Sequence, residues 1–172
     1  MSRTTITTAA LAAAGTTLFV LPASSHVGLE PSSAAANATV NVAFRIGHGC
    51  GESPTTAVRI RIPAGVTGAQ PQPKPGWNLA VTKGPLPGAV AAAGDALPSE
   101  GVIQIDWTGG KLPAEFFDTF VVRMKVPNTP NATVFFPVVQ ECETGVHRWI
   151  ETPVAGQPEP PEPMPGLRLT AP

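Results

Sequence analysis

Apolar and polar residues alternate along short runs of this chain. Val58, Ile60 and Ile62, for example, are separated by Arg59 and Arg61. Successive side chains of a β-strand point to opposite faces, so a period of two predicts a strand with one buried face. The same pattern covers residues 40–46, 58–62, 79–81, 103–107 and 120–126.

Two further segments extend this all-β pattern. Residues 134–139 are apolar on both faces, which is typical of a central strand, although Pro137 requires a bulge or a sheet edge. Residues 166–170 predict a last edge strand, and only residues 113–118 indicate a helical turn. Seven or more short strands with Pro- and Gly-rich turns favour a β-sandwich or barrel.

Two segments predict loops instead. Residues 84–101 are rich in Gly, Ala and Pro and predict a surface loop. Residues 153–165 contain Pro158-Glu159-Pro160-Pro161-Glu162-Pro163, which predicts an extended polyproline connection before the last strand.

The composition narrows the class of protein. The 172 residues include 17 Gly and 21 Pro, which leave little room for long helices. Only 13% of the residues are charged and the formal net charge is −1, so the chain lacks the basic surface of a nucleic-acid-binding protein. The length suits a single domain.

The N-terminus has the pattern of a secretory signal peptide. Arg3 precedes a short apolar run at residues 9–21, Pro22 ends the run, and small residues follow up to Ser25. The run is too short for the ~20 residues that span a bilayer. We therefore predict cleavage after Ser25, which leaves residues 26–172 as one domain without a membrane span, exported to the periplasm or cell envelope.

Cys50 and Cys142 are expected to form a disulfide, because oxidising compartments favour pairing of exported thiols. A bridge that closes so long a loop contributes roughly 4–5 kcal/mol in the chain-entropy model. A metal site built on the two cysteines is the alternative, and their long spacing disfavours it.

Motifs for catalysis are scarce: the chain has no G-x-S-x-G, HExxH, CxxC or phosphate-binding glycine loop. Asn37 and Asn131 each begin an Asn-Ala-Thr glycosylation sequon, which has meaning only in a host with that machinery. Met124 and Met164 lie far apart in the sequence and form no clustered thioether site for Cu(I).

His26 becomes the first residue of the mature chain if cleavage follows Ser25. A terminal histidine offers its α-amine and its imidazole to one metal ion, and the two groups form a chelate ring that no internal histidine can form. The ordinary pKa of an α-amine, about 7.7–8, makes loss of its proton inexpensive near neutral pH. Nitrogen ligands in a planar arrangement suit Cu(II), so this position predicts a copper site.

The chain resembles the bacterial YcnI-like family, long labelled a domain of unknown function. The segments that carry the resemblance are HVGLEP (26–31), FRIGHGCGESPTT (44–56), PKPGW (73–77), WTGGKLP (107–113), FPVVQEC (136–142) and RWIE (148–151). The resemblance spans about residues 26–170. It implies an immunoglobulin- or cupredoxin-like β-sandwich that binds Cu(II) through its N-terminal histidine and accompanies membrane proteins of copper uptake or handling.

The resemblance also assigns roles to single residues. His26 matches the terminal histidine of the family's copper site, and Trp149 matches the tryptophan beside the copper. Other members add a glutamate just after the strand that corresponds to residues 44–46, where this chain has His48, with Glu52 a few residues later. Either His48 replaces the carboxylate or Glu52 keeps its role, and imidazole chemistry favours His48. His48 as a turn residue that only supports Cys50 is the structural alternative.

His147 lies two residues before Trp149, on the same face of a strand. It is either a third ligand or, as we expect, an exposed histidine at the rim of the site. Trp149 is expected either to shield the copper or simply to pack in the core, and Trp77 and Trp107 are expected to be structural.

These features favour a binding protein over an enzyme. The leading hypothesis is an exported Cu(II) chaperone or storage module that serves a membrane copper-handling partner. A copper polysaccharide monooxygenase shares the terminal histidine and a second histidine, but the chain has no Tyr and no evident aromatic platform for a glycan. A structural envelope domain in which His26 binds nothing is the third hypothesis.

Overall fold

The alternating segments form β-strands in the computed structural model, which describes residues 26–86 and 100–172. No helix occurs within these two ranges. The strands are β1 (Gly28–Glu30), β2 (Ser33–Ala35), β3 (Thr39–Ile46), β4 (Thr55–Arg61), β5 (Thr67–Pro71), β6 (Asn78–Pro85), β7 (Glu100–Leu112), β8 (Asp118–Lys125), β9 (Thr133–Phe135), β10 (Val138–Cys142), β11 (Val146–Trp149) and β12 (Gly166–Thr170).

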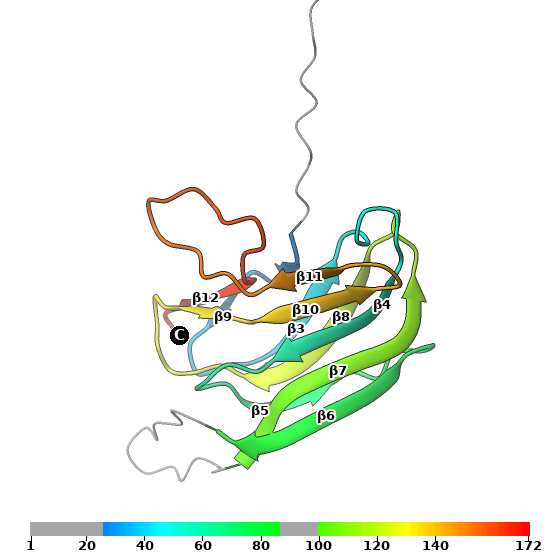
Figure 1. The fold of residues 1–172 in the computed structure, drawn as a ribbon. Coiled ribbons are helices and arrows are strands. Elements are labelled where there is room, and N and C mark those ends of the chain that lie inside the picture. Colours follow the sequence, from blue (N-terminus) through cyan, green and yellow to red (C-terminus); the bar gives the residue numbers. More distant parts are fainter. Residues whose placement is uncertain (1–25, 87–99) are drawn as a thin grey trace, which may run out of the picture.

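Two sheets pack face to face, with a small third sheet at one end (Figure 1). The first has the order β1-β3-β8-β5 and the second the order β11-β10-β4-β7-β6. The small sheet has the order β2-β12-β9. All neighbours pair antiparallel except β2 and β12, which are parallel. The fold is therefore a single β-sandwich.

The core lies between the two main sheets. Phe44 of β3 and Phe120 of β8 face it from one sheet, and Ile60 of β4 and Trp107 of β7 face it from the other; all four are at most 1% exposed. Trp107 also donates its indole N–H to the carbonyl of Gln72 at 3.2 Å. The residues that alternate with these, such as Arg59, are more exposed. The predicted alternation is confirmed.

The edge of the second sheet departs from that pattern. The period of two predicts that Val81 shares the buried face with Leu79, but Val81 is 43% exposed. It lies on β6, the last strand of its sheet, where the opposite sheet provides less cover. Residues 113–118 form the single turn expected there, with Phe116 N–H bonded to the carbonyl of Pro113 at 3.1 Å.

The apolar run 134–139 is two strands and not one central strand. Pro137 lies between β9 and β10, and the chain changes sheet there: Val134 pairs with Leu167 of the small sheet, whereas Val138 pairs with Ile60 and Trp149 of the second sheet. A proline lacks the N–H that a continuous strand would donate, so the break falls at this residue.

The C-terminal prediction needs two corrections. Residues 166–170 do form a strand, β12, but it lies between β2 and β9 and not at an edge. Residues 153–165 are not an extended connection, because the segment returns to its start. Glu151 bridges Pro163, and Met164 N–H bonds to the carbonyl of Glu151 at 2.8 Å, so the segment is a loop closed at its base (Figure 1).

The predicted signal peptide, residues 1–25, lies outside the described residues, as does most of the predicted 84–101 loop. At the ends of that loop, β6 continues to Pro85 and β7 begins at Glu100. Within the described ranges, no helix long and apolar enough to cross a membrane is present.

Candidate metal centre

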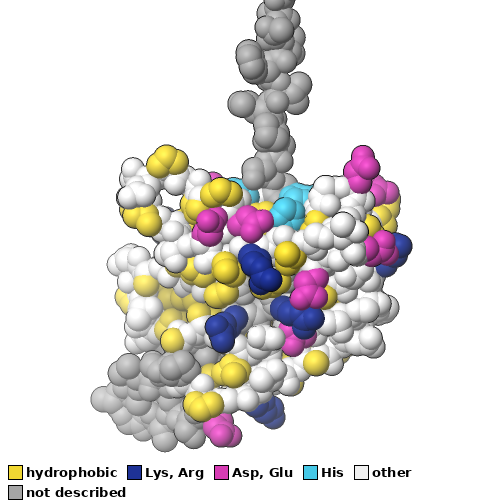
Figure 2. All heavy atoms as spheres, viewed as in Figure 1, with side chains coloured by type: hydrophobic (Ala, Val, Ile, Leu, Met, Phe, Trp, Pro, Cys, Tyr) yellow, Lys and Arg dark blue, Asp and Glu magenta, His cyan; other side chains and the backbone are white. Residues whose placement is uncertain are grey.

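His26, His48 and His147 gather around Trp149, and we call these four residues the histidine cluster. The ring centres of the three histidines lie 5.8, 6.4 and 5.1 Å from that of Trp149, respectively. Figure 2 shows histidine side chains close together at one end of the molecule, with acidic side chains beside them. All the histidines of the sequence therefore meet at one place.

Strand pairing brings the cluster together from both main sheets. β1 pairs antiparallel with β3, with Gly28 opposite Arg45, so the residue before β1 runs beside the residues that follow β3. This pairing carries His26 toward His48. β1 and β11 are edge strands of different sheets, and β11 carries His147 and Trp149. The cluster therefore closes one side of the sandwich, where the two edges meet.

Trp149 and Gln140 form the buried base of the cluster. Trp149 is 3% exposed, and its indole N–H donates to Oε1 of Gln140 at 3.2 Å. Gln140 is 1% exposed and uses its amide N–H groups to bond the His48 carbonyl at 2.6 Å and Thr55 Oγ1 at 2.8 Å. This buried amide therefore ties β11, β4 and the His48 loop to one point.

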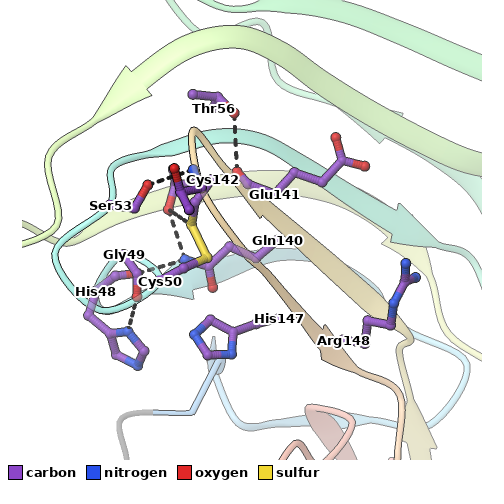
Figure 3. Close-up of a disulfide and its surroundings, with 12 residues drawn as sticks. His48, Gly49, Cys50, Ser53, Thr56, Gln140, Glu141, Cys142, His147 and Arg148 are labelled. Atoms are coloured by element: carbon purple, nitrogen blue, oxygen red, sulfur yellow. Dashed lines mark hydrogen bonds between the residues drawn. A yellow bond between two sulfur atoms is a disulfide. The ribbon is translucent and has the colours of Figure 1, made fainter.

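The loop that carries His48 is held by several bonds. The Cys50–Cys142 disulfide is present, with the two Cα atoms 6.0 Å apart, and it joins this loop to the end of β10 (Figure 3). Cys50 and Ser53 exchange backbone hydrogen bonds. A Cβ on Gly49 would collide with the carbonyl of Ser53 and with Ala114, so glycine is required for this close approach.

His48 and His147 face one another in the cluster. Their ring centres are 5.7 Å apart with an interplanar angle of 89°, and Figure 3 shows both rings on the same side of the disulfide. Nδ1 of His48 lies 2.5 Å from the carbonyl oxygen of Gly49. A carbonyl only accepts, so Nδ1 carries the proton, and in the neutral ring Nε2 has the lone pair.

His147 is oriented by Glu162 of the proline-rich loop. The Nδ1 atom of His147 lies 2.7 Å from Oε1 of Glu162, and the backbone N–H of Arg148 donates to Oε2 at 2.8 Å. Burial alone would raise the pKa of Glu162, but these two hydrogen bonds hold that pKa below its usual value. The carboxylate therefore accepts, and Nδ1 of His147 carries the proton.

His26 contacts the same loop. Its Nδ1 atom lies 3.5 Å from Oε1 of Glu159, an ion pair when the imidazole is protonated. Its side chain is 24% exposed, whereas that of Glu159 is 63% exposed. The proline-rich loop thus brings one carboxylate to His26 and another to His147.

Glu52 is not among these contacts; it is exposed in the turn between Cys50 and Ser53. The sequence analysis missed Gln140, Glu159 and Glu162 as parts of the site. Gln140 had a readable signal, because it shares the inward-facing period of β10 with Val138. The two glutamates had none, because only the return of the loop brings them to the cluster.

The three imidazoles of the cluster suit a metal that prefers nitrogen ligands, such as Cu(II). Within residues 26–86 and 100–172, no group of three or more His, Cys, Asp or Glu side chains is arranged so that it could hold a metal ion. In the full chain the backbone nitrogen of His26 is part of the peptide bond with Ser25, so it is an amide. The α-amine that a chelate requires would form only on cleavage between these two residues.

Comparison with known families identifies the domain. Residues 26–169 match the domain of unknown function DUF1775, the YcnI-like family, which covers most of the chain. The chain belongs to this family. The resemblance inferred from the sequence segments is therefore confirmed, and this DUF1775 domain begins at His26.

A solved structure supports the fold of the DUF1775 domain. The domain is similar to the crystal structure of a protein from Nocardia farcinica, which is described as uncharacterized and as having an immunoglobulin-like fold. The two chains are 30% identical and superpose with a TM-score of 0.63, over 84% of this chain and 98% of the other. The predicted immunoglobulin-like sandwich is confirmed. A search of curated proteins found no match.

Proposed function

We propose that this DUF1775 domain is an exported Cu(II)-binding protein whose site is completed when cleavage after Ser25 frees the amine of His26. The amine and Nδ1 of His26 would form the chelate, and Nε2 of His48 would add a second imidazole. Trp149 would shield the ion. The copper would be held for a membrane copper-handling partner, in a chaperone or storage role, without a chemical reaction at the metal.

The observation that carries this proposal is the meeting of His26 and His48 around Trp149. Their ring centres lie 5.8 and 6.4 Å from the indole, although the residues come from the ends of different strands. The hydrogen bond from Nδ1 of His48 to Gly49 resembles the bonds by which metal-binding histidines are oriented. His48 is therefore preferred to Glu52 as the ligand beyond His26.

The cysteines support export. The Cys50–Cys142 bond is favoured in an oxidising compartment, and a signal peptide at residues 1–25 would deliver the chain to one. An exported domain of this kind would meet copper in its oxidised form, for which nitrogen donors are suited.

The test is a Cu(II) titration of the mature protein, followed by electron paramagnetic resonance. A chain that begins at His26 should show one tight, nitrogen-rich site. The same chain with one extra alanine before His26 should bind far more weakly, because the amine is then an amide. Equal affinity in both proteins would overturn the chelate. Mass spectrometry of the native N-terminus tests whether cleavage follows Ser25.

Three further measurements separate the alternatives. His48→Ala should weaken Cu(II) binding strongly, whereas Glu52→Ala should leave it unchanged; the reverse result would transfer the ligand role to Glu52. Oxidative cleavage of chitin or cellulose by the copper-loaded protein with a reductant and peroxide would instead indicate a monooxygenase.

A further inference from the structure

The proline-rich loop and His147 suggest a larger site than the chelate alone. We propose that His147 is a third imidazole ligand of the metal and that Glu162 is its positioning residue. This inference rests on the proposed function, because it concerns the same ion. It assigns residues 153–165 to the metal site, in place of a role as a plain connection.

The separation of the rings supports two imidazoles on one ion. Imidazoles bound through metal–nitrogen bonds of about 2.0 Å have ring centres about 4.5–6.3 Å apart, depending on the angle at the metal. His48 and His147 are 5.7 Å apart, within that range. Both also contact Trp149, so an ion between their rings would lie beside the indole.

The hydrogen bonds of His147 follow the pattern of metal-binding histidines. Such residues usually donate one ring N–H to a carboxylate or a carbonyl and bind the metal through the other nitrogen. His147 donates Nδ1–H to Glu162, as His48 does to the carbonyl of Gly49. In both neutral rings the lone pair is therefore on Nε2. Glu162 is half-buried, with 32% of its side chain exposed, so the carboxylate is held against His147 at the site and not out in solvent.

Three hydrogen bonds hold the carboxylate and the backbone of Glu162. Its Oε2 accepts the N–H of Arg148, its own N–H donates to Oε2 of Glu151 at 2.7 Å, and its carbonyl accepts the N–H of Glu151 at 3.1 Å. The prolines on both sides of Glu162 restrict the backbone further and lower the entropy lost on ordering it. The carboxylate is therefore preorganised to hold the imidazole of His147.

His26 and His147 have different relations to the loop. Glu159 approaches Nδ1 of His26, the nitrogen that the chelate would use, so it competes with the ion for this ring. Glu162 instead approaches the nitrogen of His147 that would not bind the metal. Glu159→Gln is consequently expected to leave Cu(II) affinity unchanged or to increase it, whereas Glu162→Gln should decrease it.

The direct test counts the imidazoles on copper. The mature protein, labelled with nitrogen-15 in its histidines and loaded with one Cu(II), should give a pulsed paramagnetic resonance spectrum with three coordinated imidazoles. His147→Gln should reduce the count to two and weaken Cu(II) at least about tenfold. Glu162→Gln should keep three imidazoles and weaken binding about tenfold, which is usual when a partner of a ligand is lost.

Glu143→Gln is the matched control, because it removes one negative charge from a surface residue whose partner is Lys111. It should change neither the count nor the affinity. A wild-type count of two, or unchanged affinity in His147→Gln, would overturn this inference while leaving the chelate of His26 intact. Failure of the wild-type protein to bind Cu(II) tightly would instead overturn the proposed function. If His147→Gln does not fold, the wild-type count decides alone.

Discussion

At the scale of single residues, the buried amide of Gln140 determines how the cluster is assembled. This side chain bonds the His48 loop, Thr55 of β4 and Trp149 of β11 at the same time. A buried polar group that loses its partner retains the full cost of its desolvation. The side chain of Gln140 therefore links three parts of the cluster through its hydrogen bonds.

Replacement of Gln140 by leucine should destabilise the metal-free protein by about 3 kcal/mol, because it removes three hydrogen bonds, each worth about 1 kcal/mol, at a buried position. Urea unfolding measures the change. Val139→Thr, on the opposite face of β10, is the control and should cost less than about 1 kcal/mol. A loss as small as that in Gln140→Leu would contradict the role of the amide.

The backbone conformation at Asn37 and Asn131 explains why asparagine suits these positions, independently of the glycosylation sequons that they begin. Asn37 and Asn131 have φ angles of 62° and 68°, the left-handed region. Asn131 follows Pro130 in a turn closed by the bond from Ala132 N–H to the carbonyl of Thr129 at 3.2 Å. Proline followed by a residue of positive φ is the pattern of a type II turn, in which Asn is tolerated.

Asn131→Ala should therefore destabilise the protein by about 1 kcal/mol, because a Cβ-bearing residue other than Asn or Asp is disfavoured at this φ. Asn131→Gly should be neutral or stabilising, since glycine adopts the angle without strain. Thermal unfolding compares them. Asn128→Ala, at an exposed neighbouring position, should have little effect; an equal loss there would contradict the turn argument.

At the scale of elements, the disulfide fixes one loop of the site to the sheet. It joins Cys50 and Cys142 across a sequence separation of 92 residues. Cys50→Ser combined with Cys142→Ser should lower the free energy of unfolding by about 4 kcal/mol, because the unfolded chain regains that loop's freedom. Reduction of the wild-type protein should produce a similar loss. Two free thiols in the native protein would contradict the pairing.

The outer face of the second sheet carries a row of charges. Arg59 of β4 lies between Asp106 of β7 at 3.3 Å and Glu141 of β10 at 2.9 Å. The hydrogen bond from Arg59 is the main reason that the pKa of Glu141 is lowered from its ordinary value of 4.5. Both side chains are more than a third exposed, so solvent screens the pair.

Glu141→Gln should therefore cost about 1 kcal/mol or less near neutral pH. A lowered carboxylate pKa contributes stability above the ordinary value of 4.5 and loses it as the pH falls through the folded-state pKa. The difference between wild-type and variant should accordingly vanish in acid. Urea unfolding at several pH values measures it, and a difference that persists in acid would contradict the ion pair.

At the scale of the whole molecule, the last strand completes the fold. β12 is the middle strand of the small sheet, and Leu167 and Leu169 on it are fully buried. Loss of one such leucine side chain costs about 2–5 kcal/mol, and a domain of this size has only about 5–15 kcal/mol in total. β12 therefore belongs to the core.

Deletion of residues 166–172 should accordingly prevent folding, since β2 and β9 lose their shared partner. Deletion of only Ala171 and Pro172, which are exposed, should leave the fold intact. Near-ultraviolet circular dichroism distinguishes the two results. A native spectrum from the longer deletion would show that the sandwich folds without its third sheet.

Local pattern alone determined much of this protein. The period of two predicted β3, β4, β7 and β8 with their buried faces, because alternation reports directly on the two faces of a strand. The disulfide between Cys50 and Cys142 was also predicted, because the sequence has only these two cysteines and pairing was expected of them.

Only the tertiary structure decided what depends on distant pairing. It divided the apolar run at Pro137 between two sheets, placed β12 at the centre of a sheet, and returned the proline-rich loop to its start. It also brought His147 beside His48 and Glu162 beside His147. These contacts join residues far apart in the sequence, and alternation specifies which face of a strand is buried but not which strand lies next to it.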